Sequence, residues 1–156
     1  MASTIADGQI YAVMNIASKT VLDLDDGKGG NNVNVSGWDP AFPTAAQNRL
    51  WKFERHGDFW KLFNYKSGTA LTMQNGASGN GTPVVGSESF DSDRQLWRFA
   101  LNSVSKKPPF FRITNKESGT VVDLNDGGSG NGTKIQGWDN NTNTRNQEWV
   151  LVSITP

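Results

Sequence analysis

The sequence repeats itself three times, and this internal repeat restricts the fold more than any other feature. Each copy contains, in the same order, a segment ending in asparagine, a segment beginning with threonine, a glycine-rich turn and a segment built around tryptophan. The period is about 50 residues, a length typical of repeat architectures. The aligned segments are residues 11–15, 60–64 and 111–115; 20–24, 69–73 and 120–124; 26–30, 75–79 and 126–130; and 50–53, 96–99 and 148–151. We therefore expect a fold with approximate threefold symmetry.

Inside each unit, apolar and polar residues alternate with a period of two, which predicts β-strands. Glycine is abundant, with 17 residues, and asparagine accompanies it between the segments, as expected for short strands joined by tight turns. Trp51, Trp97 and Trp149 fall on the apolar side of their segments, and we predict that they are core residues. No segment shows the apolar period of about 3.6 residues that marks an amphipathic helix. The predicted fold class is all-β.

The chain has 156 residues, a length that suits one domain, and we predict a single domain over residues 1–156. A unit of about four strands cannot bury its own apolar face, so the three units should close on one another as a small barrel without exposed strand edges. The repeats are predicted at about residues 8–55, 57–103 and 107–154, with Lys106–Pro109 as a stiff link between the second and the third.

Composition argues against several functions. The 15 basic and 15 acidic residues balance, so nucleic acid is not an expected partner. No apolar run approaches the ~20 residues of a membrane span, so we expect no membrane insertion. The chain has no cysteine and one histidine, which leaves little for metal sites or for a Ser-His-Asp mechanism, and no cofactor is expected. No secretory signal is visible, and the lack of cysteine suits a reducing compartment, so we expect a cytoplasmic location.

The tryptophan segments carry a short tag. Two of them contain the pattern Q-x-W, ending at Trp97 and at Trp149, and the first has Arg49 in place of the glutamine. In order and spacing these tags resemble those of the ricin B-chain-like (R-type) β-trefoil lectins. The cysteine-free single domain is similar to the cytoplasmic ricin B-like lectins of mushrooms. The resemblance covers essentially the whole chain, and it implies a β-trefoil fold with three four-stranded repeats and a carbohydrate-binding function without catalysis.

The first and third units share three residue types that the core does not need. Alternation places an aspartate on the outer side of a strand, a tryptophan ends the following strand, and an asparagine stands just before the tag. These residues are Asp23, Trp38 and Asn48 in the first unit, and Asp123, Trp138 and Asn146 in the third.

The middle unit differs from the other two at all three of these positions. Its aligned residues are Thr72, Glu88 and Arg94, although its apolar alternation is unchanged. Because the three positions change together while the scaffold does not, we predict a pocket in units one and three and none in unit two.

The chemistry of this trio suits a sugar. An indole offers a flat surface for the apolar face of a hexose, a carboxylate accepts hydrogen bonds from adjacent hydroxyls, and an amide both donates and accepts. The resemblance implies that terminal galactose or N-acetylgalactosamine stacks on the indole, and that glycans are the partners of the chain. It adds the residues just before each tryptophan to the site, which are Gln136 and Gly137 in unit three and Ser36 and Gly37 in unit one.

Unit one departs from the pattern of the family in three respects. Ser36 stands where the family has a glutamine, Arg49 replaces the glutamine of the tag, and the loop between Trp38 and Trp51 is two residues longer than its counterpart in unit three. We therefore expect the pocket of unit three to be the closer match.

Two other functions are alternatives to a lectin. A glycosidase needs two carboxylates, about 5–10 Å apart, around the scissile bond. Asp39 beside Asp23, and Asp139 beside Asp123, are the only obvious supply, and an open surface pocket would not raise the pKa of one of them. A protein-binding module such as a protease inhibitor would use a loop, for which residues 40–47 are the candidate.

A homodimer would increase the number of pockets and with it the apparent affinity.

Overall fold

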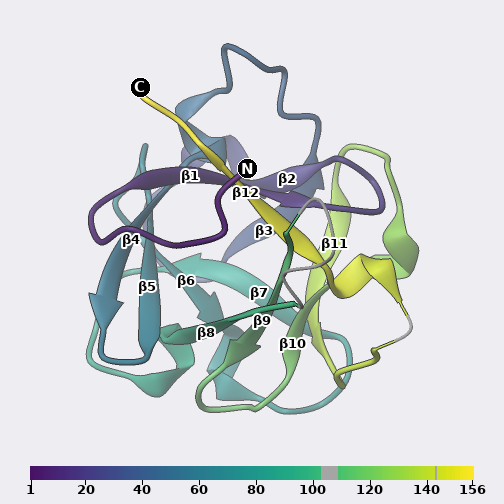
Figure 1. Ribbon diagram of the computed structural model, residues 1–156. Helices are drawn as coiled ribbons and strands as arrows, with labels where there is room; N and C mark the ends of the chain where they lie inside the picture. Colours follow the sequence, from purple (N-terminus) through teal and green to yellow (C-terminus); the bar gives the residue numbers. More distant parts are fainter. Residues whose placement is uncertain (103–108, 143) are drawn as a thin grey trace.

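The computed structural model describes residues 1–102, 109–142 and 144–156, and it is an all-β structure of twelve strands (Figure 1). Four strands come from each third of the chain. The first four are β1 (Ile10–Asn15), β2 (Val21–Leu24), β3 (Val33–Trp38) and β4 (Trp51–His56). The next four are β5 (Phe59–Asn64), β6 (Ala70–Met73), β7 (Thr82–Ser87) and β8 (Trp97–Leu101). The last four are β9 (Phe111–Asn115), β10 (Val121–Leu124), β11 (Thr133–Trp138) and β12 (Trp149–Ser153).

Short 3₁₀ helices occur at the same two places in every repeat. One follows the second strand, as η1 (Asp25–Gly27), η3 (Gln74–Gly76) and η5 (Asn125–Gly127). The other precedes the fourth strand, as η2 (Gln47–Arg49), η4 (Asp93–Gln95) and η6 (Arg145–Gln147). Within the described ranges, no helix is long and apolar enough to cross a membrane. Of the predicted link at 106–109, residues 106–108 lie outside the described residues.

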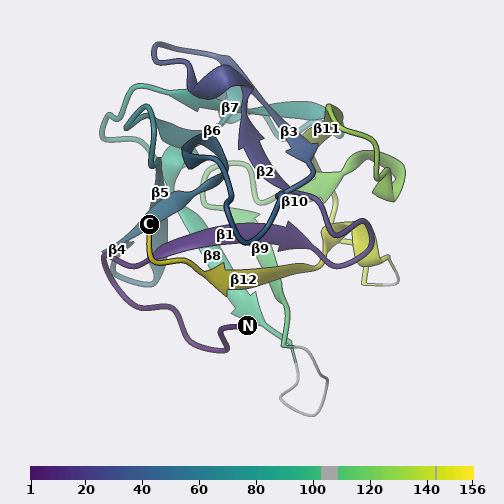
Figure 2. The ribbon, with the colours of Figure 1, turned by 90° about the horizontal axis from the view of Figure 1, so that it is seen from above.

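Six strands form a closed barrel. Strand β1 pairs with β4, β4 with β5, β5 with β8, β8 with β9, β9 with β12, and β12 returns to β1. The other six form the hairpins β2–β3, β6–β7 and β10–β11, whose second strands β3, β7 and β11 pair with one another. Figure 2 shows β3, β6, β7 and β11 toward one end of the molecule and β1, β8, β9 and β12 toward the other. This is the architecture of a β-trefoil, as predicted.

The tag tryptophans are buried in the barrel, which confirms the prediction that they are core residues. Trp51 and Trp97 have no exposed surface, and Trp149 is 1% exposed. Each indole N–H also donates a 3.0 Å hydrogen bond to a backbone carbonyl on the second strand of its repeat. The acceptors are Leu22 O for Trp51, Leu71 O for Trp97 and Val122 O for Trp149. In each repeat a core tryptophan thus fixes the second strand, which carries Asp23, Thr72 or Asp123.

Buried asparagines join neighbouring repeats at the barrel. Each accepts hydrogen bonds on its side-chain oxygen from the turn that follows it, and its amide donates to a backbone carbonyl in the repeat before it. The donating amides and their acceptors are Asn15 with Asn146 O, Asn64 with Asn48 O, and Asn115 with Arg94 O, at 2.9–3.0 Å. Because the acceptors belong to η6, η2 and η4, each repeat fixes the 3₁₀ helix that precedes the fourth strand of its neighbour.

We expect Trp97→Ala to reduce the free energy of unfolding by about 3–5 kcal/mol, because it leaves a large cavity in a close-packed core. Trp97→Phe should cost less, since it keeps most of the volume and loses the hydrogen bond to Leu71 O. Denaturant unfolding followed by fluorescence measures both. A loss below about 1 kcal/mol for Trp97→Ala would contradict the assignment of this tryptophan to the core.

Candidate functional site

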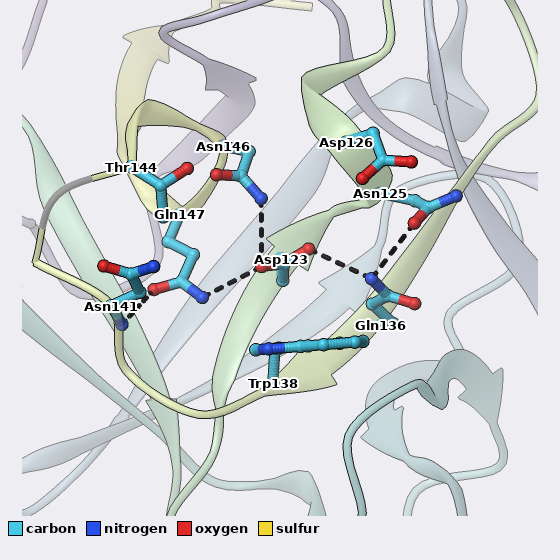
Figure 3. A pocket seen from close by; sticks show the side chains of 9 residues that line it. All are labelled: Asp123, Asn125, Asp126, Gln136, Trp138, Asn141, Thr144, Asn146 and Gln147. Carbon is cyan, nitrogen blue, oxygen red and sulfur yellow. Dashed lines mark hydrogen bonds between the residues drawn. The ribbon is translucent and has the colours of Figure 1, made fainter.

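The third repeat contains a hollow of about 210 Å³ at the predicted place (Figure 3). Its walls come from β10, η5, β11, η6 and the loop between β11 and η6. The lining residues are Asp123, Asn125, Asp126, Gln136, Trp138, Asn141, Thr144, Asn146 and Gln147. The predicted residues Asp123, Gln136, Trp138 and Asn146 therefore meet in one hollow.

The carboxylate of Asp123 is held by three side-chain amides. Asn146 Nδ2 and Gln147 Nε2 donate to Asp123 Oδ2 at 3.0 and 2.9 Å, and Gln136 Nε2 donates to Oδ1 at 3.1 Å. Asp123 points away from the barrel core, as the alternation predicted, but it is only 4% exposed because the amides surround it. A carboxylate has about four acceptor positions, so three of these bonds fix its orientation and leave capacity for a ligand hydroxyl.

Trp138 ends β11 and supplies the apolar surface of the hollow. It is 39% exposed, in contrast to the buried tag tryptophans. Figure 3 shows its indole edge-on, with Asp123 and Gln136 on one side of the ring. An apolar plate thus faces fixed polar groups across the hollow.

The tag glutamine Gln147 belongs to this site as well as to the scaffold. It has no exposed surface, and besides Asp123 its amide donates to Asp139 O at 2.9 Å, while its Oε1 accepts from the Asn141 backbone N–H at 2.7 Å. From the sequence this residue was predicted only as a mark of the fold. Its place directly after the site asparagine Asn146 was the signal that could have assigned it to the pocket.

Asparagines of the glycine-rich turns hold the loop after each third strand. Asn80 Oδ1 accepts from the Asp139 backbone N–H at 2.9 Å, so the second repeat steadies the loop after Trp138. The corresponding bonds run from the Asp39 N–H to Asn131 Oδ1 at 2.8 Å and from the Glu88 N–H to Asn31 Oδ1 at 3.0 Å. Sequence reasoning did not assign these asparagines to the site, although one follows a glycine at the same place in all three turns.

The first repeat also brings Asp23, Trp38 and Asn48 together, but its carboxylate has a charged partner. Asn48 Nδ2 donates to Asp23 Oδ2 at 3.1 Å, as in the third repeat. Arg49, which replaces the tag glutamine, forms an ion pair with the same oxygen at 2.7 Å, and its guanidinium lies 5.9 Å from the centre of the Trp38 ring. The Trp38 indole is half-buried. In the first repeat a guanidinium therefore lies beside both the carboxylate and the tryptophan. In the third repeat the groups bonded to the carboxylate are neutral amides.

The Asp23 carboxyl is under two opposing influences. Burial has the larger effect and leaves the pKa of Asp23 above its ordinary value, although Arg49 and the amide of Asn48 lower it. The expectation that the pocket would not raise the pKa of such a carboxyl is therefore wrong for Asp23. The ion pair with Arg49 therefore offsets part of the cost of burying this charge. Ser36, which faces Asp23 across the β2–β3 pair, is 4% exposed and has no amide to replace the contact that Gln136 makes.

The second repeat corrects one detail of the predicted alignment. Ala70 pairs with Ser87, as Val121 pairs with Trp138, so Ser87 and not Glu88 stands at the tryptophan position. The assignment of Glu88 was one residue too far along the chain, because Trp38, Ser87 and Trp138 each lie 23 residues after the aligned asparagines Asn15, Asn64 and Asn115. Thr72 and Arg94 do occupy the aspartate and asparagine positions, and Gln95 Nε2 donates to Thr72 Oγ1 at 3.1 Å.

The two predicted site glycines prove to be packing residues. Gly37 and Gly137 are buried where the hairpins pack on one another. A Cβ on Gly137 would lie 2.7 Å from Met73 Cε and 2.8 Å from Thr120 Oγ1, and one on Gly37 would lie 2.8 Å from Leu124 Cδ1. Gly86 is under the same restriction in the second repeat, which has no site tryptophan. The structure therefore gives these glycines a role in close approach of strands and no contact with the hollow.

Comparison with known proteins places this architecture in a defined group. The model of the ricin-type β-trefoil lectin domain-like family matches residues 3–86 and 93–156. A comparison with curated proteins finds no matching relative.

Several solved structures share the fold. The designed threefold-symmetric protein ThreeFoil superposes with a TM-score of 0.83 at 22% identity, covering 92% of this chain and 97% of its own. The Rhizoctonia solani agglutinin gives 0.82 at 24% identity, with 97% and 99% covered. The Macrolepiota procera ricin B-like lectin, solved in complex with lactose, gives 0.75 at 24% identity, with 96% and 98% covered.

Substitution of Gly137 separates a packing role from a binding role. We expect Gly137→Ala to lower the free energy of unfolding by about 1–3 kcal/mol, because the new methyl group must displace Met73 or Thr120. Gly130→Ala is the matched control: it lies nearby on an open turn with nothing within 4 Å of the added Cβ, and it should change stability by less than about 0.5 kcal/mol. Equal stability of the two variants in denaturant unfolding would contradict the packing role.

Proposed function

Because this chain belongs to the ricin-type β-trefoil lectin domain-like family, we propose that it is a carbohydrate-binding lectin that takes terminal galactose or N-acetylgalactosamine in the hollow of the third repeat. The observation that carries this proposal is the pairing of the exposed Trp138 ring with the amide-held carboxylate of Asp123 across one hollow. The lactose complex of the Macrolepiota procera lectin supports a galactoside as the ligand class.

The geometry suits a galactoside in two ways. The apolar C–H face of the sugar would lie on the Trp138 indole, where burial of apolar surface is favourable. Adjacent hydroxyls would donate to Asp123, whose oxygens are already oriented by Asn146, Gln147 and Gln136. Hydrogen bonds to a charged acceptor contribute roughly 1.5–3 kcal/mol each, so this carboxylate would supply most of the selectivity for hydroxyl arrangement.

A shallow hollow of this kind binds weakly. A single sugar buries little surface and loses its translational freedom, so we expect dissociation constants of about 0.1–1 mM for a simple galactoside. Higher apparent affinity for branched glycans would then require a second hollow on the same chain or a second copy in a homodimer.

The first repeat is proposed to be the weaker galactoside site. Arg49 already forms an ion pair with Asp23 at 2.7 Å and lies over Trp38, so a sugar would compete with the guanidinium for both groups. The aspartate, tryptophan and asparagine are the same in both repeats, whereas Arg49 and Ser36 replace the two glutamines, Gln147 and Gln136, that hold the carboxylate in the third.

We assign no catalytic step to this site. A glycosidase needs one acid with a raised pKa and a second carboxylate placed across the bond. Asp123 is instead committed to three amide donors. Among the described residues, no group of three or more acidic, histidine or cysteine side chains is placed to hold a metal ion.

The alternative of a protease inhibitor acting through residues 40–47 is separated from a lectin by comparing a glycan array with a protease panel.

We expect Trp138→Ala to weaken binding of lactose at the third repeat by about tenfold or more, because it removes the apolar surface of the hollow. Isothermal titration calorimetry measures the change, and the midpoint of thermal unfolding should stay close to that of the unaltered protein, since Trp138 is 39% exposed. Trp38→Ala is the matched control and should have a much smaller effect on the total heat. Unchanged lactose binding in the Trp138→Ala, Trp38→Ala double variant would refute the proposal.

Arg49→Gln should make the first repeat resemble the third. Glutamine can donate its amide to Asp23, as Gln147 does to Asp123, and it releases the Trp38 face. In the Trp138→Ala background we expect this substitution to restore lactose binding by about fivefold or more. Arg145→Gln, which replaces an arginine of η6, is the control and should restore nothing. No gain from Arg49→Gln would show that the guanidinium does not limit the first hollow.

A further inference from the structure

The second repeat, predicted to lack a pocket, contains a hollow at the place that corresponds to the hollow of the third repeat. Its volume is about 350 Å³. It is lined by Asn31, Asn32, Thr72, Asn75, Ser87, Glu88, Ser89, Phe90 and Arg94. The backbone frame of the site is therefore retained, while its aspartate, tryptophan and asparagine are exchanged for Thr72, Ser87 and Arg94.

The guanidinium of Arg94 has no anion to balance it. Its Nε is buried and has no hydrogen-bond partner in the described part of the chain, and no carboxylate there comes within 4.0 Å of it. The first repeat shows the contrast, because its arginine, Arg49, pairs with Asp23 at 2.7 Å. The corresponding residue here is Thr72, whose hydroxyl donates to Ala70 O and accepts from Gln95. A partly buried cation without a partner invites an anionic ligand.

The hollow also has an apolar surface beside this cation. Phe90 is 44% exposed, and the Arg94 guanidinium lies 5.6 Å from the centre of its ring. The Phe90 backbone N–H donates to the buried Gln95 Oε1 at 3.0 Å, which fixes the loop that carries the ring. A guanidinium that lies against an aromatic ring keeps its in-plane N–H groups available. These groups can bind a carboxylate in a bidentate geometry.

The remaining groups select the kind of anion. Glu88 is exposed at the wall of the hollow, and Asn32 and Asn75 add side-chain amides. A bare inorganic anion would be repelled by Glu88 and would leave Phe90 uncovered. A sugar that bears a carboxylate could place that group on Arg94, its hydroxyls on Glu88 and the amides, and an apolar face on Phe90.

We propose that the hollow of the second repeat is a separate binding site for an acidic saccharide, with Arg94 binding the carboxylate, Phe90 the apolar face and Glu88 the hydroxyls. The choice of a saccharide rests on the proposed lectin function, whereas the preference for a carboxylate rests on Arg94 alone. The chain would then combine one neutral and one acidic sugar site in different repeats.

The test titrates the full chain with methyl glucuronide and with methyl α-sialoside, using methyl glucoside as the neutral match, and follows binding by NMR. We expect at least one of the two acids to bind about tenfold more tightly than the glucoside. Arg94→Gln should abolish this preference, while Arg145→Gln, the control at an exposed arginine of η6 outside this hollow, should leave it intact. Binding of the acid should also weaken as sodium chloride is raised, since an exposed part of the interaction is between charges.

Three results would overturn the proposal: neither acid is preferred over the glucoside, the preference survives Arg94→Gln, or sodium sulfate competes as well as the sugar acid does. Lactose, titrated into the same samples, reports on the third repeat independently. Loss of lactose binding in Trp138→Ala with retained binding of the acid would support two separate sites. Acid binding without any lactose binding in the unaltered protein would contradict the galactoside proposal and leave this one standing.

Discussion

The hydrogen bond from each buried tag indole to the second strand of its repeat is the interaction on which the rest of the structure depends. Trp51, Trp97 and Trp149 fill the barrel, and their N–H groups find carbonyl partners at 3.0 Å, so a large aromatic side chain is buried without leaving a polar atom unpaired. The carbonyl in each case belongs to the residue just before Asp23, Thr72 or Asp123. The same contact that closes the core therefore also fixes the strand from which the site residue projects.

The repeats support one another in a ring, because the contacts that shape a site cross from one repeat to the next. Asn15 of the first repeat holds the carbonyl of Asn146, and Asn80 of the second holds the loop after Trp138. The hollow of the third repeat thus depends on residues from the whole chain. Because these contacts hold the backbone from below, the side chains that face the solvent can differ between repeats without a change of fold.

The three repeats accordingly differ in charge at the position of the site. In the third repeat neutral amides hold the carboxylate of Asp123, in the first Arg49 neutralises Asp23, and in the second Arg94 has no acidic partner among the described residues. Arg49 stands at the position of the tag glutamine, whereas Arg94 stands at the position of the asparagine in a repeat whose aspartate is replaced by Thr72. Divergence between the repeats is therefore a matter of a few polar side chains, with the apolar core unchanged.

Sequence by itself determined the fold class, the closed threefold barrel and the burial of the tag tryptophans, because these follow from residue periodicity along the chain and from the need to bury apolar faces. It also brought Asp123, Trp138 and Asn146 together, since the third repeat keeps them at matching positions. Tertiary structure alone decided that Gly137 packs against Met73 and that Arg49 pairs with Asp23. The physical reason is that these contacts join strands, loops or repeats distant in sequence. A pattern read along one segment carries no information about the side chain that arrives from another.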